Sequence, residues 1–272
     1  MTAEEPAPSR TALSGIIPGS PWFGDDVAGV QSIGARYLYQ VATISALQSM
    51  DRPVRVLEIG SWIGASALTW AYAIDRFCPQ GGSVLCIDPW KGYFNKEQVE
   101  AFEVYKRMHN LAESGSAYAL FLHNVATGPG RVPIHHFRGT SRETLPYLTS
   151  ASFDVVYVDG AHDHAGVSYD LSQGRRLVRE GGIICGDDLE LQLPDCNYPI
   201  DAAVASYDCV TLPGHIEPFH PGVTLAVHEA FGVVSCYEGF WIMRRTTQGF
   251  APVDLIGAGT FVPPHLAGRV QI

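Results

Sequence analysis

The stretch of residues 54–66 constrains the fold of this chain more than any other segment. It opens with an apolar, β-branched run from Val54 to Ile59, which is typical of a buried parallel strand. The run stops at Gly60, and from Ile63 onward apolar residues recur at helical spacing. A strand, a glycine turn and a helix N-terminus in direct succession present backbone N–H groups to a ligand. Gly60 and Gly64 allow close approach, because glycine has no Cβ atom.

The glycine spacing differs from the fingerprint of dinucleotide-binding proteins. It reads Glu58-x-Gly60-x-x-x-Gly64, which lacks the G-x-G pair and therefore counts against a nicotinamide-dependent dehydrogenase. Glu58, on the last turn of the strand, would repel a pyrophosphate and attract the amino group of a methionine moiety. Either the glycines serve helix–strand packing only, or the turn binds a zwitterionic or cationic ligand.

Strands and helices alternate along the rest of the chain. Further strands are predicted at residues 83–88, 132–137, 153–158, 183–185, 223–227 and 239–244, and helices at 35–49, 95–126, 166–178 and 200–207. This order predicts an α/β fold with a doubly wound, mostly parallel seven-stranded sheet whose last strand is antiparallel. We expect an N-terminal arm and helix at 1–50 (a lid or oligomer contact), the main domain at 51–248 and a C-terminal tail at 249–272.

The composition limits the kinds of partner that the chain can bind. The chain carries 18 Lys and Arg against 28 Asp and Glu, and its net charge of −10 leaves no basic face for nucleic acid or an anionic membrane. Its six cysteines form no C-x-x-C pair, which favours reduced thiols. No apolar run approaches membrane-spanning length and no secretory signal is visible. A cytoplasmic protein is expected.

Polar residues at the second and third strand ends are candidates for ligand contacts. Asp88 closes the second strand, where an acid commonly binds ribose hydroxyls, and Trp90 is placed to stack on or near a base. Asp88 alternatively caps the following turn. After the third strand, Ser141 is expected to be a helix N-cap with an incomplete capping box, because Thr144 stands where Glu is usual.

Three acids follow the next two strand ends. Asp159 ends the fourth strand and the Asp187–Asp188 pair ends the fifth, so their backbones should lie on the order of 5 Å apart. Converging carboxylates favour a hard cation such as Mg²⁺, although Asp is also common in turns for its own reasons. His162 follows Asp159 by three residues and is a candidate general base, with His164 as a competitor.

The segments above resemble the class I S-adenosylmethionine-dependent methyltransferases. The motifs that carry the resemblance are, in order, Leu57–Gly64, Ile87–Asp88, Val156–His162 and Gly181–Asp188. Among these enzymes, the chain is most similar to the bacterial metal-dependent sugar and macrolide O-methyltransferases. The similarity spans roughly residues 52–245.

This resemblance implies a set of roles for the motif residues. Cofactor contacts would come from Glu58, Gly60, Ser61 and Gly64 at the methionine part of S-adenosylmethionine, from Asp88 at its ribose, and from Trp90, Thr140 and Ser141 nearer its adenine. Asp159, Asp187 and Asp188 would hold Mg²⁺, so that Asp159 and His162 form the catalytic pair. The acceptor would be a hydroxyl of a small molecule, a sugar or a natural product.

Two departures from the family pattern limit these assignments. Gly139-Thr140-Ser141 stands where many relatives have Gly-Asp-Ser or Gly-Asp-Ala, which weakens the adenine contacts. Asp187–Asp188 stands where the catechol methyltransferases have Asp-Asn, which argues against a close relative of those enzymes. A metal-independent N- or O-methyltransferase and a non-catalytic protein that binds the cofactor remain alternatives.

The aromatic residues do not identify the acceptor. They either line an acceptor pocket or fill the core, with core favoured for Phe240 and Trp241; the others are Trp22, Phe23, Tyr93, Phe94 and Phe219. His220 precedes a predicted strand, and no argument from sequence places it in the site.

Overall fold

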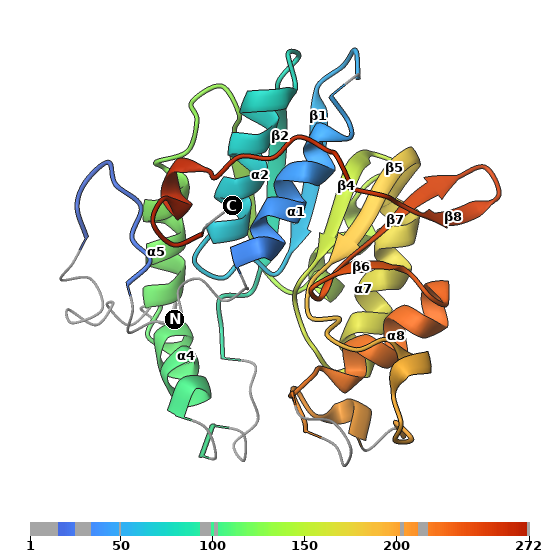
Figure 1. Ribbon diagram of the computed structural model, residues 1–272. Helices are drawn as coiled ribbons and strands as arrows, with labels where there is room; N and C mark the ends of the chain where they lie inside the picture. The colour runs from blue at the N-terminus through green and yellow to red at the C-terminus, as the bar shows by residue number, and fades with distance from the viewer. Residues whose placement is uncertain are drawn as a thin grey trace.

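A single eight-stranded sheet forms the centre of the protein (Figure 1). The computed structural model describes residues 16–24, 34–48, 50–92, 99–100, 103–201, 204–211 and 217–270. The strands are β1 (Val54–Ile59), β2 (Gly82–Asp88), β3 (Ile134–Arg138), β4 (Phe153–Val158), β5 (Val178–Gly186), β6 (Ser235–Tyr237), β7 (Phe240–Thr246) and β8 (Gly249–Pro252). Their order is β3-β2-β1-β4-β5-β7-β6, with β8 also paired to β7. Strands β1 to β5 are parallel and β7 runs antiparallel to its neighbours, which confirms the predicted doubly wound sheet.

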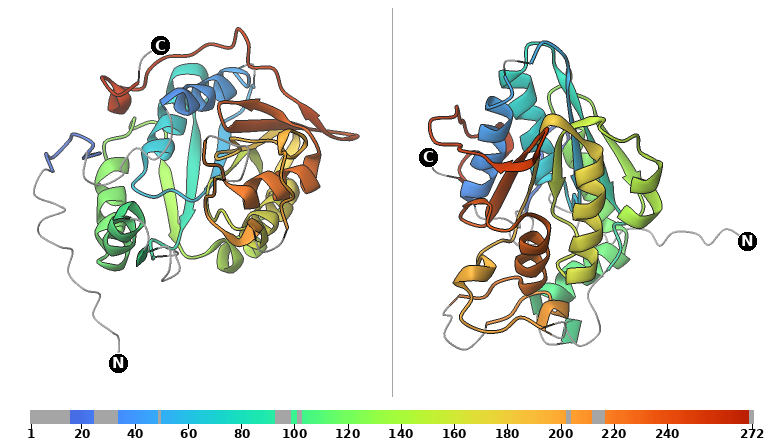
Figure 2. Two further views of the ribbon diagram at one scale, coloured as in Figure 1. Left: turned by 60° about the horizontal axis from the view of Figure 1, so that its bottom comes forward. Right: turned by 90° about the vertical axis from the view of Figure 1, so that its right-hand side faces the viewer.

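Helices cover both faces of the sheet (Figure 2). On one face lie α1 (Gly34–Ser45), α2 (Ala65–Phe77) and α5 (Ser116–Val125), and on the other α6 (Ser141–Thr144), α7 (His164–Leu177) and α8 (Pro221–Phe231). Strand β1 serves both layers: Val54 and Val56 pack with the first set, and Leu57 and Ile59 with the second. This two-sided burial explains why the strand is apolar without interruption.

Residues 223–227, predicted as a strand, belong instead to helix α8. Its buried residues Val223, Ala226 and Val227 recur at the spacing of a helix face, and Pro221 occupies the first turn, where its missing N–H costs nothing. A five-residue apolar run is too short for periodicity to separate a strand from a helix.

Two predicted helices are shorter than expected. The segment 95–126 contains α4 (Glu103–Glu113) and α5, separated at Gly115, whose φ of 75° favours glycine. The predicted helix at 200–207 is reduced, among the residues described there, to the 3₁₀ turn Val204–Ser206. Tyr93 and Phe94 lie outside the described residues.

The tail from residue 249 is part of the fold. Strand β8 extends the sheet to eight strands rather than the seven predicted, so the expected boundary at 248 separates two paired strands. Farther on, a 3₁₀ turn (Pro264–Leu266) packs on α2, where the buried His265 Nε2 lies 2.9 Å from the carbonyl oxygen of Ala65. The tail therefore holds the outer face of α2.

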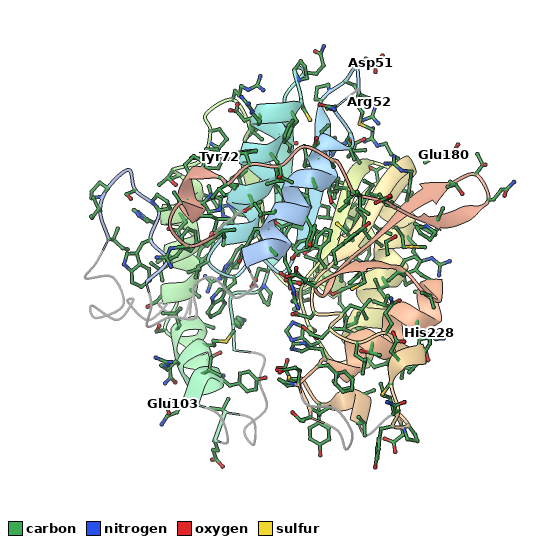
Figure 3. The ribbon with its side chains drawn as sticks, viewed as in Figure 1. Asp51, Arg52, Tyr72, Glu103, Glu180 and His228 are labelled. Carbon is green, nitrogen blue, oxygen red and sulfur yellow. The ribbon has the colours of Figure 1, made fainter. Side chains whose placement is uncertain are left out.

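The two edges of the sheet differ in what they carry. In Figure 3, Asp51, Arg52 and Glu180 mark the edge where the parallel strands begin, and Glu103 and His228 mark helices that flank the opposite edge. Of the aromatic residues left open by the sequence, Phe23, Phe219, Phe240 and Trp241 are buried, as predicted for the last two. In the part of the chain that the structure describes, no helix has the length and apolar character needed to cross a bilayer.

Candidate active site

A cavity of about 620 Å³ lies beyond the carboxyl ends of β1, β2, β4 and β5. Among the predicted site residues, the following line it: Gly60, Ser61, Asp88, Trp90, Thr140, Ser141, Asp159, His162, Asp187 and Asp188. Glu58 and Gly64 lie outside this lining. The location is the one expected for ligands of an open α/β sheet.

The β1–α2 turn and Asp88 form one wall of the cavity. Gly60 has a φ of 84°, and a Cβ atom there would lie 1.9 Å from the carbonyl oxygen of Asp159, so only glycine fits. Asp88 Oδ2 accepts the backbone N–H groups of Ser61 (2.9 Å) and Trp62 (3.0 Å). Its Oδ1 accepts the backbone N–H of Trp90 at 2.6 Å, so Asp88 caps the following turn, the alternative left open by the sequence, and it also lines the cavity.

Glu58 lies in the interior of the fold and is held by side chains around it. Its side chain is fully buried and accepts hydrogen bonds from the hydroxyls of Ser61 and Ser66 and from the Cys86 thiol. Burial raises the pKa of Glu58 to about 7. All three partners belong to the fold, and Glu58 is not among the residues that line the cavity, so its contact with the cofactor stays a prediction. Gly64 likewise faces helix α5, where a Cβ atom would meet Val125 at 3.2 Å.

Trp90 lies beneath the cavity more than within it. The side chain is 1 % exposed, packs on Phe121 with ring centroids 4.5 Å apart, and donates its indole N–H to the carbonyl oxygen of Trp62 at 2.6 Å. It therefore supports the wall that carries Asp88.

The N-cap after β3 is Thr140 and not Ser141. The Thr140 hydroxyl accepts the backbone N–H of Glu143, and the Glu143 carboxylate accepts the backbone N–H of Thr140 at 2.9 Å, which completes the capping box. The prediction counted one residue too late and therefore found no acid at the third position. Ser141 is left free of the cap and lines the cavity.

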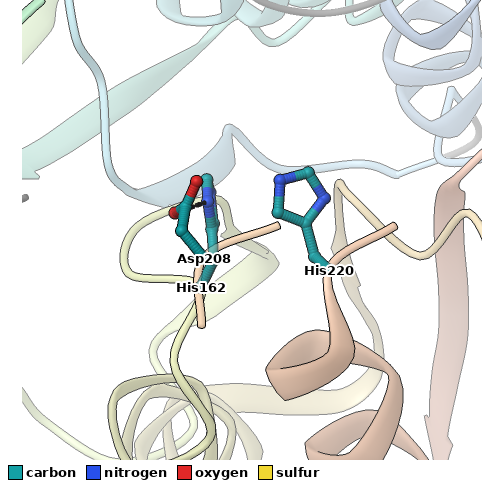
Figure 4. Close-up of side chains that lie close together, drawn as sticks. All are labelled: His162, Asp208 and His220. Atoms are coloured by element: carbon teal, nitrogen blue, oxygen red, sulfur yellow. Dashed lines mark hydrogen bonds and ion pairs between the residues drawn. The ribbon is translucent and has the colours of Figure 1, made fainter. Parts of the chain in front are cut away.

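His162 is held by an aspartate that the sequence did not reveal. Its Nδ1 lies 2.8 Å from Asp208 Oδ1, an interaction drawn in Figure 4, and the Tyr105 hydroxyl donates to the other oxygen of Asp208. Its Nε2 lies 3.1 Å from Asp188 Oδ2. Burial opposes protonation, but Asp188 and Asp208 outweigh it and raise the pKa of His162 well above its usual value.

His220 stands beside His162. The two rings meet edge to face with centroids 4.6 Å apart (Figure 4), and His220 Nδ1 lies 3.0 Å from Glu190 Oε2. His164, the competing candidate, instead pairs with Glu229 on α8 at 2.7 Å. Of the two histidines weighed from sequence, His162 is therefore the one in the cavity.

Asp159 and Asp188 converge with His162. One potential ligand atom from each of the three lies within 4.8 Å of the others. Asp159 also accepts the Tyr157 hydroxyl at 3.1 Å. Burial and the neighbouring Asp187 and Asp188 raise the pKa of Asp159 well above its usual value, and His162 offsets them only in part.

Asp187 faces the other way, toward a buried arginine of helix α1. Arg36 is 3 % exposed; its guanidinium lies 2.6 Å from Asp187 Oδ1, 3.0 Å from Asp188 Oδ1 and 2.9 Å from Glu190 Oε1. Burial alone would lower the pKa of Arg36, but Asp187 and Asp188 raise it instead. Arg36 thus pairs with Asp187 and with one oxygen of Asp188, while Asp159 and Asp188 converge with His162.

Sequence reasoning missed the groups that come from distant segments: Arg36, Tyr105, Asp208 and His220. Asp208 is 46 residues from His162, and Arg36 is 151 residues from Asp187. No local pattern marks either of them. Glu190 could have been proposed from the sequence, because it follows the Asp187–Asp188 pair by two positions.

Comparison with known proteins agrees with this geometry. The family described as "Methyltransferase domain" matches residues 57–189, the segment from β1 to the residue after the acid pair. Residues 57–189 are thus similar to a methyltransferase domain, in agreement with the resemblance drawn from the motifs.

A curated relative agrees with the match to this family. The O-methyltransferase ankF of Aspergillus thermomutatus is 30% identical over 142 residues, which are 52% of this chain and 48% of that protein. The chain therefore spans about half the length of the curated relative that it matches.

Two solved structures are similar at a lower level. The O-methyltransferase TomG from Streptomyces achromogenes is 21% identical, with 88% of this chain and 92% of that chain covered and a TM-score of 0.42. A putative O-methyltransferase from Klebsiella pneumoniae is 18% identical, with 87% and 95% covered and a TM-score of 0.46.

Proposed function

We propose that the protein transfers the methyl group of S-adenosylmethionine to a hydroxyl oxygen of a small molecule, a sugar or another natural product. The observation that carries the proposal is the cavity that joins the Gly60–Ser61 turn and Asp88 to the His162–Asp208 pair. The cofactor, when bound, supplies an electrophilic methyl group on a sulfonium. The acceptor hydroxyl would lie at the acid end of the cavity, within reach of His162.

His162 acts in this proposal as the general base. Asp208 binds Nδ1 and so orients the ring; Nε2, which lies 3.1 Å from Asp188 Oδ2, has to release its proton to Asp188 or to solvent before it takes the hydroxyl proton. The acceptor oxygen forms the new C–O bond as the C–S bond breaks, and the proton stays on His162. Tyr105 holds Asp208 from the opposite side, which keeps the pair in one orientation.

Mg²⁺ fits the residues at the acid end, and we include it in the proposal. Asp159 and Asp188 would hold it, since carboxylate oxygens are its preferred ligands, and it would supply a Lewis acid for the acceptor oxygen. Arg36 balances only part of the charge of Asp159, Asp187, Asp188 and Glu190, so the cluster retains a surplus that favours a cation. A cation at Asp188 would also compete with the proton of His162 for that carboxylate.

A metal-independent O- or N-methyltransferase is the second candidate. Arg36 favours it, because a resident cation already pairs with Asp187 and Asp188. Calorimetric titration of MgCl₂ into the protein with S-adenosylhomocysteine bound distinguishes the two. The metal scheme is supported if the wild type gives a saturable binding heat that is lost in both Asp159→Asn and Asp188→Asn. The exposed control Asp195→Asn should keep this heat. If the wild type gives no binding heat, the metal-independent candidate is selected.

Loss of the base provides the test of the transfer itself. With a small panel of hydroxylated acceptors, His162→Ala should lower turnover by a factor on the order of 10² or more, while the Kd for S-adenosylhomocysteine stays close to that of the wild type. His164→Ala, outside the cavity, is the matched control. Wild-type protein that binds no S-adenosylhomocysteine would refute the proposed function outright. Normal turnover in His162→Ala would exclude His162 as the general base.

A further inference from the structure

Three side chains from separate segments of the chain meet at one side of the cavity: His162, Asp208 and His220 (Figure 4). One potential ligand atom from each lies within 4.8 Å of the other two. All three line the cavity, and their side chains are 16 %, 10 % and 17 % exposed, so an ion in solution can reach them. Only His162 is shared with the group that it forms with Asp159 and Asp188.

The fold fixes the segments that carry these side chains. The backbones of Val210 and Phe219 exchange two hydrogen bonds of 3.0 Å, which join the segment of the aspartate to that of the second histidine. Gly222, in the first turn of α8, lies so close to the β4–α7 loop that a Cβ atom there would be 2.2 Å from the carbonyl oxygen of His162. Only glycine allows this approach. The three groups are therefore held together by backbone contacts.

Both histidines are hydrogen-bonded in the way that metal-binding histidines are. Nδ1 of His220 lies 3.0 Å from Glu190 Oε2, and Figure 4 shows its other nitrogen on the side of the ring that faces His162. His162 meets Asp208 through Nδ1, while its Nε2 lies 3.1 Å from Asp188 Oδ2. A histidine that binds a metal usually has its second ring nitrogen held by a carboxylate, which orients the ring. This leaves Nδ1 of His162 and Nε2 of His220 as the ligand atoms.

The aspartate has the same arrangement. One oxygen of Asp208 lies 2.8 Å from His162, and the other accepts the Tyr105 hydroxyl, which orients the carboxylate. Ligand atoms around a tetrahedral ion lie about 3.3 Å apart, so this pair has to open by only about half an ångström. Two imidazole nitrogens and one carboxylate oxygen suit a transition-metal ion such as Zn²⁺ better than Mg²⁺, which prefers oxygen ligands.

We propose that His162, Asp208 and His220 bind a transition-metal dication of the Zn²⁺ type, and that an ion held there inhibits methyl transfer. With the ion on Nδ1, Nε2 of His162 keeps its proton toward Asp188 and cannot accept the proton of the acceptor hydroxyl. The inhibition rests on the proposed function, in which His162 is the general base. The metal site itself does not.

The first test measures zinc binding in the absence of any acceptor. ZnCl₂ is titrated by calorimetry into reduced, metal-free protein in an excess of MgCl₂, and one ion per chain should bind the wild type. His220→Ala removes a ligand and should weaken binding by more than about 100-fold. Glu190→Gln changes only the partner of a ligand and should weaken it by roughly 10- to 100-fold.

Two control variants show where the ion binds. His164→Ala should keep the wild-type Kd, because His164 also pairs with a carboxylate but lies outside the cavity. Asp159→Asn should keep it too, because Asp159 is not a ligand of this site. A wild type that binds no Zn²⁺ would overturn the site. Binding that Asp159→Asn abolishes and a folded His220→Ala retains would overturn it as well.

A spectrum gives a readout that does not depend on the folding of any variant. Co²⁺ added to the wild type in place of Zn²⁺ should give the intense visible absorption bands of a four-coordinate ion with nitrogen ligands, and excess MgCl₂ should not remove them. A wild-type spectrum that is the same as that of Co²⁺ in buffer would overturn the site.

The last test separates the inhibition from the proposed function. Zn²⁺ at ten times its Kd should lower wild-type turnover by about tenfold, in line with its occupancy. At the same concentration, His220→Ala should keep its own zinc-free rate. Unchanged turnover in wild-type protein that calorimetry shows to be loaded would overturn the inhibition. If no transfer occurs even without Zn²⁺, the proposed function fails, and the metal site is decided by calorimetry and the Co²⁺ spectrum.

Discussion

At the scale of single residues, long-range pairs decide what each side chain in the cavity does. His162 would be an unremarkable loop histidine without Asp208, which comes from a different segment and fixes its Nδ1. Asp187, which the sequence grouped with Asp159 and Asp188, pairs with Arg36 from helix α1. Residue type and spacing nominate candidates, and the partner decides the role.

The orienting role of Asp208 predicts a specific kinetic defect. Asp208→Asn can still contact His162, but it loses the charge that stabilises the protonated ring, so turnover should fall by a factor on the order of 10 or more. Steady-state kinetics with the same acceptor panel measures this. The Kd for S-adenosylhomocysteine should change little, and Tyr105→Phe should show a smaller defect in the same direction. Wild-type turnover in Asp208→Asn would show that His162 needs no partner.

Arg36 predicts a large loss of stability. Arg36→Met removes the only guanidinium seen to pair with Asp187 and Asp188 among the described residues, leaving buried charges uncompensated at a cost of about 3–5 kcal/mol. Urea unfolding measures the free energy of unfolding. The control is Arg131→Met, whose ion pair with Asp75 is solvent-exposed and should contribute less than about 1 kcal/mol. Equal effects of the two substitutions would contradict this account.

At the scale of elements, the C-terminal tail and helix α2 depend on each other through His265. The imidazole Nε2 meets the Ala65 carbonyl oxygen and the Thr69 hydroxyl, and its ring stacks on Tyr72 at 5.7 Å. Burial lowers the pKa of His265 to about 4. The unfolded chain therefore binds this proton more readily than the folded one.

This shift predicts an acid sensitivity of known sign. The contribution of neutral His265 to the free energy of unfolding should be fully present above about pH 6.5. It should fall as the pH drops toward 4, by roughly 3 kcal/mol if the tail and the domain unfold together. Thermal unfolding across this range should show a flatter profile for His265→Gln than for the wild type. His135→Gln, on the exposed edge strand β3, should keep the wild-type slope. If only the tail is released, hydrogen exchange of residues 250–270 should rise first.

At the scale of the whole molecule, the sequence predicted the architecture and one half of the site. The strand order follows from alternation and from acids at strand ends, because parallel strands bring successive ends to one edge. Residues 223–227 failed as a strand because five apolar residues show no usable period. Arg36, Tyr105 and Asp208 could not be found, since nothing in their own segments distinguishes them from surface residues until the fold brings them to His162 and Asp187.

Helix α1 precedes both the expected start of the main domain at residue 51 and the matched segment at 57, yet its Arg36 supplies the counter-charge of the acid pair. A fragment trimmed to either border would keep every motif but lose the arginine that offsets part of the negative charge of the acid pair. Instability or low activity of such a fragment would reflect the loss of Arg36 and not the chemistry of the intact chain. Recombinant versions of this protein need residues 34–45 to be informative.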